Sequence, residues 1–458
     1  MKVAVFGAGY VGLVTGAVLA DLGHQVTLIE VSEEKIALIN QRRSPIFEEG
    51  LEPIIARAMD QGHLSVTSAP ETVVGSSEVI FIAVGTPPLP DGEADLRFVR
   101  QAALAIGRNM TGETRQVIVN KATVPIGSAN LVEVWVQDGY REVHGRVPSN
   151  EWYTVASNPE FLREGTAVLD TLYPDRIVLG ADEEWAIERL QELYLPITQQ
   201  SFEPPPEAPR PHGLTASPVF VTDRISSEMI KYAANAFLAT KISFANEIAN
   251  VSERVGADVV QVMRGIGLDQ RIGGRFLNAG IGWGGSCFGK DLAALTVTAE
   301  EYGYQPRLLY ATQEVNRDQR LLVVKRLQEV LKPIKGRRIA VWGVAFKPGT
   351  DDLRDAPSLT IIEELLRLGA RVRVYDPIAL ENLRRLRPDF DVEYADSAED
   401  ALDGADALIL ATEWPSFAEI PLSTIAERLT RGIVIDGRNF WDPNAAVRVG
   451  LQYRGIGR

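Results

Sequence analysis

The sequence predicts an α/β protein with two doubly wound domains and a long helix between them in the chain. In the first half, short apolar runs bounded by glycine or proline alternate with helical stretches, which is typical of parallel strands buried on both faces. The glycine motif "GAGYVG" directly follows the first of these runs. The same alternation begins again in the last third of the chain. A length of 458 residues is enough for two or three domains.

Six runs rich in valine and isoleucine are the predicted strands of the first domain. They are 2–9, 25–30, 79–86, 116–125, 153–160 and 176–181. The stretch 202–213 is rich in proline and has no apolar period, so we expect a stiff, exposed connector. The segment 223–255 has few helix breakers and apolar residues at near-fourfold spacing. We expect one long helix there, which joins two lobes or packs against a partner subunit.

The rest of the chain is expected to form a glycine-dense loop, further helices and a second, smaller domain. The loop spans 265–289, and helix follows to about residue 331. Four more strands are predicted at 337–346, 371–377, 407–412 and 432–438. The chain then divides into three regions: 1–213, 214–331 and 332–458.

Composition excludes several classes of function. A net charge of −14 argues against nucleic-acid binding, although a locally positive site could still hold an anionic substrate. No apolar run approaches the roughly 18 residues of a membrane span. The N-terminus is typical of a strand and turn rather than a signal peptide, and one cysteine cannot form an intramolecular disulfide, so we expect a cytoplasmic protein. The four histidines lie outside every motif, and no metal site is expected.

The motif "GAGYVG" predicts a dinucleotide site. Gly7 allows a tight turn, Gly9 lets the backbone approach a pyrophosphate, and Gly12 lets helix pack on strand. A second predicted strand ends at Glu30, which would bind the ribose hydroxyls and favour NAD over NADP, although Lys35 lies nearby in the sequence. The alternative is a glycine-rich turn in a domain that binds no nucleotide.

Cys287 is the only cysteine and lies in "GWGGSCFGKD", at a plausible helix start. The helix dipole and Lys290 would both raise its thiolate fraction, as a nucleophile requires. Asp291 lies one turn further on and could orient a water or a lysine. A buried structural cysteine is the alternative, because that is where free cysteines usually lie.

Two residue pairs could assist such chemistry. Lys231 and Asn235 are four apart on the long predicted helix, so they share a face and could hold an oxyanion. Glu160 and Glu164 follow a predicted strand end, where α/β sites form, and could act as base and cofactor contact. A surface lysine–asparagine pair and an acidic first helical turn are the respective alternatives.

Five basic residues could bind a diphosphate, since arginine binds phosphate oxygens bidentately. They are Arg271, Arg275, Lys347, Arg354 and Arg438. Scattered surface charge would explain the same residues.

Taken together, the motifs resemble the UDP-glucose 6-dehydrogenases of the UDP-glucose/GDP-mannose dehydrogenase family over almost the whole chain. The matching segments occur in the family's order: "GAGYVG", "SPIFEEGL", "VGTPPLPDGEADL", "KATVPIG", "NPEFLREGTA", "KYAANAFLATKISFANEIA", "DQRIGGRFLNAGIGWGGSCFGKD", "FKPGTDD" and "IDGRN". The resemblance implies two Rossmann-like domains, for NAD and for the UDP-sugar, and a central helix that forms the core of a homodimer or dimer of dimers. It also implies the oxidation of UDP-glucose to UDP-glucuronate with two NAD.

The resemblance implies the site residues as well. Cys287 matches the nucleophile, Lys231 and Asn235 the oxyanion pair, Asp291 and Thr123 the groups that position water, and Glu160 the base. Positions matching NAD contacts are Gly7, Gly9, Val11, Gly12, Glu30, Lys35, Thr86, Thr123, Glu164, Lys290 and Arg354. Positions matching substrate contacts are Glu160, Phe161, Leu162, Arg163, Glu164, Lys231, Asn235, Arg271, Phe276, Leu277, Asn278, Ala279, Gly280, Gly284, Lys347 and Arg438. Arg271 resembles an arginine lent by a neighbouring subunit.

Three departures and three rival functions accompany this resemblance. Glu30 stands where aspartate is common, Gly289 where proline is frequent, and Trp283 where phenylalanine is usual, so its ring could alter the sugar pocket. The rivals are the same chemistry on GDP-mannose or another nucleotide sugar, a single-step oxidoreductase that needs no Cys287, and a non-catalytic nucleotide-sugar binding protein.

Overall fold

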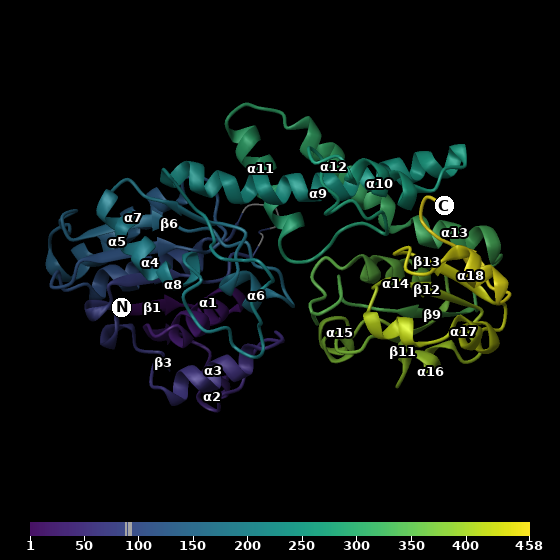
Figure 1. Cartoon of the computed structure of the whole chain (residues 1–458), viewed down its shortest axis with the longest axis horizontal. Helices are drawn as coiled ribbons and strands as arrows, with labels where there is room; N and C mark the ends of the chain where they lie inside the picture. Colours follow the sequence, from purple (N-terminus) through teal and green to yellow (C-terminus); the bar gives the residue numbers. More distant parts are fainter. Residues whose placement is uncertain (88, 90–93) are drawn as a thin grey trace. The chain divides into compact units, whose positions relative to one another are not determined.

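The computed structural model describes residues 1–87, 89 and 94–458, so part of the segment "VGTPPLPDGEADL" lies outside the described residues. The described chain forms two compact units, Met1–Ala233 and Ala234–Arg458. The boundary between them falls inside one helix, α9 (Arg224–Val255). This helix has 32 residues and confirms the long helix expected at 223–255. Figure 1 shows both units with their sheets and helices.

The first unit is built on an eight-stranded sheet with the order β3-β2-β1-β4-β5-β6-β7-β8. Its strands are β1 (Lys2–Phe6), β2 (Gln25–Ile29), β3 (Leu64–Thr67), β4 (Val79–Ile82), β5 (Gln116–Asn120), β6 (Tyr153–Ser157), β7 (Ile177–Gly180) and β8 (Val219–Thr222). All pairs are parallel except β6 with β7. The strand order reverses between β1 and β4, and ligands of such sheets bind at the carboxyl ends of the strands on either side of that point.

Helices cover both faces of this sheet because both faces of its strands are apolar. Val3 and Val5 of β1 belong to one core cluster, while Ala4 and Phe6 belong to the other. The helices are α1 (Tyr10–Asp21), α2 (Glu33–Asn40), α3 (Leu51–Asp60), α4 (Arg97–Asn109), α5 (Ser128–His144), α6 (Ala167–Leu172), α7 (Glu184–Leu193) and α8 (Leu195–Thr198), with short 3-10 turns η1 (Pro70–Thr72) and η2 (Val74–Ser76). This is the doubly wound arrangement that the alternating pattern predicts.

The second unit contains a six-stranded, all-parallel sheet with the order β11-β10-β9-β12-β13-β14. Its strands are β9 (Arg338–Trp342), β10 (Arg371–Tyr375), β11 (Val392–Tyr394), β12 (Ala407–Leu410), β13 (Ile433–Asp436) and β14 (Gln452–Arg454). Around it lie α14 (Pro357–Arg367), α15 (Leu380–Leu386), α16 (Ala398–Leu402), η3 (Pro415–Glu419), α17 (Leu422–Arg428) and α18 (Pro443–Arg448). The same strand-order reversal recurs between β9 and β12, so the α/β architecture predicted for two domains is confirmed.

The helical part of the second unit differs in detail from the expectation. It comprises the rest of α9 with α10 (Val259–Gly267), α11 (Phe288–Glu301), α12 (Arg307–Arg320) and α13 (Leu322–Val330). The glycine-dense loop is therefore shorter than 265–289, because Gly265 lies in α10 and Gly289 in α11. None of the helices in the described part of the chain has the length and hydropathy that a bilayer crossing requires.

Four edge strands and the proline-rich stretch also correct the sequence expectations. The strands β3, β8, β11 and β14 were not predicted, because each has only three or four residues and several of them are exposed. The stretch 202–213 contains no helix or strand, as expected, but it is not simply exposed. Ala208 is fully buried, and its carbonyl accepts a hydrogen bond from the Tyr173 hydroxyl at 2.7 Å.

Candidate active site

The turn between β1 and α1 has the geometry of a phosphate-binding turn. Gly7 has a φ of +96°, which favours glycine, and a Cβ there would lie 2.9 Å from the Ala83 carbonyl oxygen. A Cβ on Gly12 would lie 1.9 Å from the Gly7 carbonyl oxygen, so only glycine lets α1 pack onto the turn. No described atom lies within 4 Å of a Cβ placed on Gly9. The backbone at Gly9 is thus open to a close ligand, at the N-terminus of a helix that favours phosphate.

Glu30 lies just after β2 and is buried beside this turn. Its carboxylate accepts N–H groups from Ala8 at 2.9 Å, Val31 at 2.8 Å and Ser32 at 3.0 Å, and Lys35 Nζ lies 3.7 Å away. Burial raises the pKa of Glu30. The N–H donors and the Lys35 charge lower it by a larger amount, so the net pKa is below the ordinary value. An ionised carboxylate next to the turn fits the ribose hydroxyls of NAD and disfavours the 2′-phosphate of NADP.

Lys231 and Glu160 form a buried ion pair in the first unit, with 2.7 Å between Nζ and Oε1. Burial raises the pKa of Glu160, but the Lys231 charge and hydrogen bond, the Leu162 N–H and the Lys121 charge together lower it by more, so the net pKa lies below the ordinary value. Glu160 is therefore a carboxylate at neutral pH. The alternative of a surface Lys231 does not apply, because the side chain is 5% exposed.

A pocket surrounds this ion pair at the carboxyl ends of β5 and β6. Its lining residues are Asn120, Lys121, Ala122, Thr123, Val124, Ser157, Pro159, Glu160, Glu228, Lys231 and Tyr232. The predicted water-positioning residue Thr123 thus lines the same pocket as Glu160 and Lys231. Its carbonyl accepts a hydrogen bond from the Thr86 hydroxyl at 2.7 Å, which ties a predicted NAD contact to the pocket wall.

Sequence reasoning missed Lys121, a second cation in this pocket. Its Nζ donates to Asn158 Oδ1 at 2.9 Å, and the Tyr194 hydroxyl donates to the same oxygen at 2.6 Å. Burial lowers the pKa of Lys121 to about 8, and the nearby Lys231 also lowers it while Glu160 raises it. Lys121 and Asn158 directly follow β5 and β6, so their place at strand ends was the available signal.

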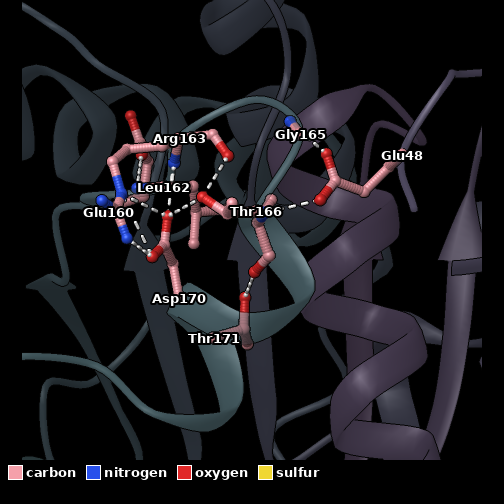
Figure 2. Close-up of polar contacts among 9 residues, drawn as sticks. Glu48, Glu160, Leu162, Arg163, Gly165, Thr166, Asp170 and Thr171 are labelled. Atoms are coloured by element: carbon pink, nitrogen blue, oxygen red, sulfur yellow. Dashed lines mark hydrogen bonds and ion pairs between the residues drawn. The ribbon is translucent and has the colours of Figure 1, made fainter. Parts of the chain in front are cut away.

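The loop between β6 and α6 carries Glu160 and Glu164. Figure 2 shows Glu160 with the neighbouring residues of this loop. Glu160 accepts the Leu162 N–H at 2.7 Å, and Arg163 pairs with Asp170 through its guanidinium at 2.5 Å. The predicted substrate contact Arg163 is therefore exposed and turned toward Asp170, which lies within α6. Phe161 lies under the Arg176 guanidinium, 3.6 Å from it.

In the second unit, Cys287 is the N-cap residue of α11, as the sequence predicts. Its side chain is partly buried, and Sγ lies 3.6 Å from the Ser286 hydroxyl. The Cys287 carbonyl accepts the Asp291 N–H at 2.9 Å in the first turn of the helix. The sulfur thus has the helix-terminal position that favours a thiolate.

Asp291 brings together two other predicted residues. Its carboxylate is almost fully buried and accepts from Asn235 Nδ2 at 2.6 Å and from Lys290 Nζ at 2.8 Å. Lys290 is therefore directed toward Asp291, which satisfies the sequence-based suggestion that Asp291 orients a lysine. The amide of Asn235 is held with its nitrogen on Asp291, which fixes the orientation of its oxygen.

The glycines before Cys287 are required by packing within the second unit. A Cβ on Gly284 would lie 2.3 Å from the Asp355 carbonyl oxygen, and one on Gly285 would lie 2.7 Å from the Phe346 ring. Gly285 also has a φ of +88° and donates its N–H to the Arg354 carbonyl at 3.0 Å. The sequence analysis names Gly284 as a substrate contact, but the space beside Gly284 and Gly285 is already filled by the protein itself.

Trp283 is packed into a core cluster rather than left open to a sugar pocket. Its ring meets the Phe288 ring edge-on at 6.1 Å, and Nε1 donates to the Ser243 hydroxyl at 3.0 Å. The buried residues around it come from α9 and α11. The larger ring therefore fills space between these helices.

The predicted basic contacts differ in their surroundings. Arg438 follows β13 and donates to the carbonyls of Ala411, Gly282 and Phe346, and so joins the glycine loop to the sheet. Arg271 pairs with Asp269 and Arg354 with Asp352, and both guanidinium groups are exposed. Lys347 Nζ lies 5.5 Å from the Phe346 ring centre.

The segment 276–280 is one of two five-residue runs of predicted substrate contacts. Phe276 has a φ of +63°, a rare conformation for a bulky residue, and its ring meets Phe288 edge-on at 6.4 Å. Leu277 and Ala279 are buried, and the Gly280 N–H donates to Asn246 Oδ1 at 2.8 Å. The backbone here is thus held in one conformation by α9 and its neighbours.

Comparison with known proteins identifies the family. Family models of the UDP-glucose/GDP-mannose dehydrogenases match the NAD binding domain at 1–198, the central domain at 225–318 and the UDP binding domain at 340–443. The chain is 41% identical to a Bacillus subtilis UDP-glucose 6-dehydrogenase, covering 100% of this chain and 98% of that protein. It is 42% identical to the Pseudomonas aeruginosa UDP-glucose 6-dehydrogenase, with coverage of 100% and 98%.

A solved structure agrees with these matches. The UDP-glucose dehydrogenase of the archaeon Pyrobaculum islandicum superposes with a TM-score of 0.86 at 38% identity, covering 100% of this chain and 97% of that one. The phosphate-binding turn and the ionised Glu30 fit the NAD that the N-terminal family model describes. The chain therefore belongs to the UDP-glucose/GDP-mannose dehydrogenase family and is an NAD-dependent oxidoreductase.

Proposed function

We propose that the chain oxidises UDP-glucose to UDP-glucuronate, consuming two NAD and one water and releasing two NADH. The observation that carries the proposal is the position of the only cysteine at the N-cap of α11, one turn before a buried Asn235–Asp291–Lys290 cluster. Identities of 41% and 42% over the whole chain to curated UDP-glucose 6-dehydrogenases support the same substrate.

Two oxidations at one carbon explain why a thiol is needed. NAD, when bound at the Gly7–Gly12 turn, accepts one hydride in each oxidation. In the first, the C6 hydroxyl loses its proton and the carbon loses a hydride, which leaves an aldehyde. The carbonyl carbon of an aldehyde cannot lose a second hydride until a nucleophile has added to it and made it tetrahedral. The Cys287 thiolate therefore adds to the carbonyl carbon, forming a C–S bond while the carbonyl electron pair moves to oxygen.

Lys231 and Asn235 stabilise the negative oxygen in this scheme, because one is a cation and the other an amide donor. Loss of the second hydride from the thiohemiacetal gives a thioester on Cys287. Water positioned by Thr123 and Asp291 attacks the thioester, and Glu160 takes its proton. The C–S bond then breaks, the thiolate is regenerated and the carboxylate product leaves. The ionised state of Glu160 suits a base.

The remaining site assignments belong to the same proposal. We assign NAD contacts to Gly7, Gly9, Val11, Gly12, Glu30, Lys35, Thr86, Thr123, Glu164, Lys290 and Arg354. We assign substrate contacts to Glu160, Phe161, Leu162, Arg163, Glu164, Lys231, Asn235, Arg271, Phe276, Leu277, Asn278, Ala279, Gly280, Gly284, Lys347 and Arg438. Gly284 contributes backbone groups only, because Asp355 occupies the space where a side chain at this position would lie.

The division into 1–213, 214–331 and 332–458 is proposed to separate NAD binding, dimerisation with the cysteine loop, and UDP-sugar binding. We further propose that two copies associate through α9. Apolar side chains at sevenfold spacing on this helix are exposed, namely Phe237, Phe244 and Val251. A cytoplasmic location is part of the proposal, because the reaction needs Cys287 as a free thiolate, which a reducing compartment maintains.

The ratio of NADH formed to UDP-glucose consumed tests the proposal. We expect a ratio of two, with UDP-glucuronate identified by mass spectrometry. A ratio of one would favour a single-step oxidoreductase, and no NADH from any nucleotide sugar would favour a binding protein. Turnover on a panel with GDP-mannose and N-acetylated UDP-sugars decides the substrate, and faster turnover on one of these would replace UDP-glucose in the proposal.

A further inference from the structure

Glu48 lies in the connection between α2 and α3, in the segment "SPIFEEGL", and is buried in the first unit. Its carboxylate accepts the backbone N–H of Gly165 at 2.7 Å and that of Ala167 at 2.6 Å. The hydroxyl of Tyr10 donates to the same carboxylate. Figure 2 shows Glu48 reaching across to the backbone at Gly165 and the start of α6. One side chain thus joins three segments that are far apart in the sequence.

Both segments that Glu48 contacts carry part of the proposed site. Tyr10 is the first residue of α1 and directly follows Gly9 of the phosphate-binding turn. Gly165 directly follows Glu164, in the loop that begins after β6 and includes Glu160. This loop has no helix or strand between Asn158 and Thr166, so its N–H groups need other acceptors.

Two other backbone N–H groups of the loop donate to carboxylates within the loop or in the helix that follows it. Leu162 donates to Glu160, and the Arg163 N–H donates to Asp170 at 2.8 Å. These contacts shape the loop but do not fix it against the phosphate-binding turn. The bonds to Glu48 do so, and the Gly165 N–H is additionally 2.8 Å from the Tyr10 hydroxyl oxygen.

We propose that Glu48 is a positioning residue. It holds the loop that carries Glu160 and Glu164 in a fixed position relative to the phosphate-binding turn. The inference rests on the proposed function, since it assigns Glu48 a role in the same reaction. A carboxylate suits this role because its two oxygens can accept from Gly165, Ala167 and Tyr10 together, through charge-assisted bonds. Glu48 acts through the loop and is not assigned a contact with substrate.

The test variant is Glu48→Gln, which preserves length and volume but turns one acceptor into an NH₂ donor. That donor must face an N–H of Gly165 or Ala167, so one of the two bonds is lost. We expect kcat to fall roughly 10- to 100-fold, as displacement of catalytic groups by about 1 Å does, while the KM for UDP-glucose changes less. Glu49→Gln is the matched control, because Glu49 is the exposed neighbour, and it should keep the original kcat.

Hydrogen–deuterium exchange supplies a readout that does not depend on turnover. Peptides covering 161–167 should exchange faster in Glu48→Gln than in Glu49→Gln, with the rest of the first sheet unchanged. Tyr10→Phe removes one donor and leaves the carboxylate, so it should raise exchange at the same peptides and lower kcat less. This variant also keeps the inference testable if Glu48→Gln fails to fold.

The kinetic and exchange results test the role of Glu48 separately from the proposed function. An unchanged kcat and unchanged exchange in Glu48→Gln would overturn the role of Glu48 while UDP-glucose oxidation stands. A lower unfolding temperature with unchanged exchange at 161–167 would also overturn it, because Glu48 would then serve stability alone. If the unmodified protein makes no UDP-glucuronate, the proposed function fails, and the exchange data still show whether Glu48 holds the loop.

Discussion

The charged residues of the first unit owe their chemical state to burial and to one another. Glu160 and Lys231 lie 2.7 Å apart and are both buried, so removal of either leaves an uncompensated charge in the interior. Lys121 shares this pocket, with a pKa lowered to about 8 chiefly by burial. Because this pKa is close to neutral pH, Lys121 loses its proton more readily than a surface lysine does. The sequence analysis assigned Glu160 and Lys231 separate roles and did not predict their contact, because 71 residues separate the two positions.

Cys287→Ser tests the covalent scheme at this scale. A serine hydroxyl at the N-cap is a far weaker nucleophile, so formation of UDP-glucuronate should fall by several orders of magnitude. Binding of NAD and UDP-glucose should be retained, because no binding contact is removed. Product formation is measured by mass spectrometry and binding by calorimetry. Formation of UDP-glucuronate at the original rate would refute the role of Cys287.

Lys231→Ala addresses the oxyanion role. Loss of the cation should lower kcat by roughly 100-fold or more, whereas nucleotide affinity should change much less. Since Glu160 would be left without its partner, its pKa should rise, and the acidic limb of the pH–rate profile should move to higher pH. Steady-state kinetics across pH measure both effects. Unchanged turnover would exclude an oxyanion role for Lys231.

Glu228 gives the clearest dependence of stability on pH. Burial raises its pKa to about 7 from 4.5, while N–H groups of Gly127 and Ala129, at 2.6 and 2.9 Å, and the nearby Arg224 lower it by less. Between these two pKa values the folded state binds a proton that the unfolded state has released. Stability from this group is therefore present at the acidic end and is lost as pH rises through about 7.

Glu228→Gln should remove this dependence. Between about pH 5 and pH 8 the unmodified protein should lose on the order of 3 kcal/mol more stability than the variant. Unfolding midpoints of both proteins measured across this range test the difference. A parallel pH dependence of the two proteins would contradict the raised pKa.

At the scale of elements, short-range patterns predicted strands and helices well where they are buried on two faces. The runs at β1, β4, β5 and β12 are continuous and apolar, and the structure has strands there. The edge strand β14 has only three residues, two of them exposed, which is too short for a periodic pattern to reveal it. The glycines before Cys287 show the same limit, because their contacts with 354–357 depend on packing with a distant segment.

A pair of glycine substitutions tests this packing. Gly284→Ala should destabilise the second unit by about 1–3 kcal/mol, because its Cβ would meet the Asp355 carbonyl. Gly265→Ala, in α10 with no described atom within 4 Å of its Cβ, should be neutral or stabilising by up to about 1 kcal/mol. Denaturation of both variants gives the comparison. If Gly284→Ala and Gly265→Ala were equally stable, the loop before Cys287 would have moved to make room for the added methyl group.

For the molecule as a whole, the exposed apolar side chains of α9 predict that two copies of the chain associate through this helix. If the proposed dimer forms through α9, Phe237→Lys and Phe244→Lys together should shift it to monomer, because two charges would be buried in the contact. Light scattering coupled to size-exclusion chromatography measures the mass. A mass of about 50.2 kDa for the unmodified chain at micromolar concentration would contradict the dimer.

The sequence alone determined the fold class, the NAD-binding turn, the long helix and the position of Cys287 at a helix start. These features depend on residues close together in the chain, such as Gly7 with Gly12, whose steric demands are local. Only the tertiary structure decided that Asn235 contacts Asp291, that Lys121 lines the same pocket as Glu160, and that Glu48 accepts the Gly165 N–H. Such contacts join residues far apart in sequence, and their partners are chosen by the packing of whole elements, on which local propensity and spacing carry no information.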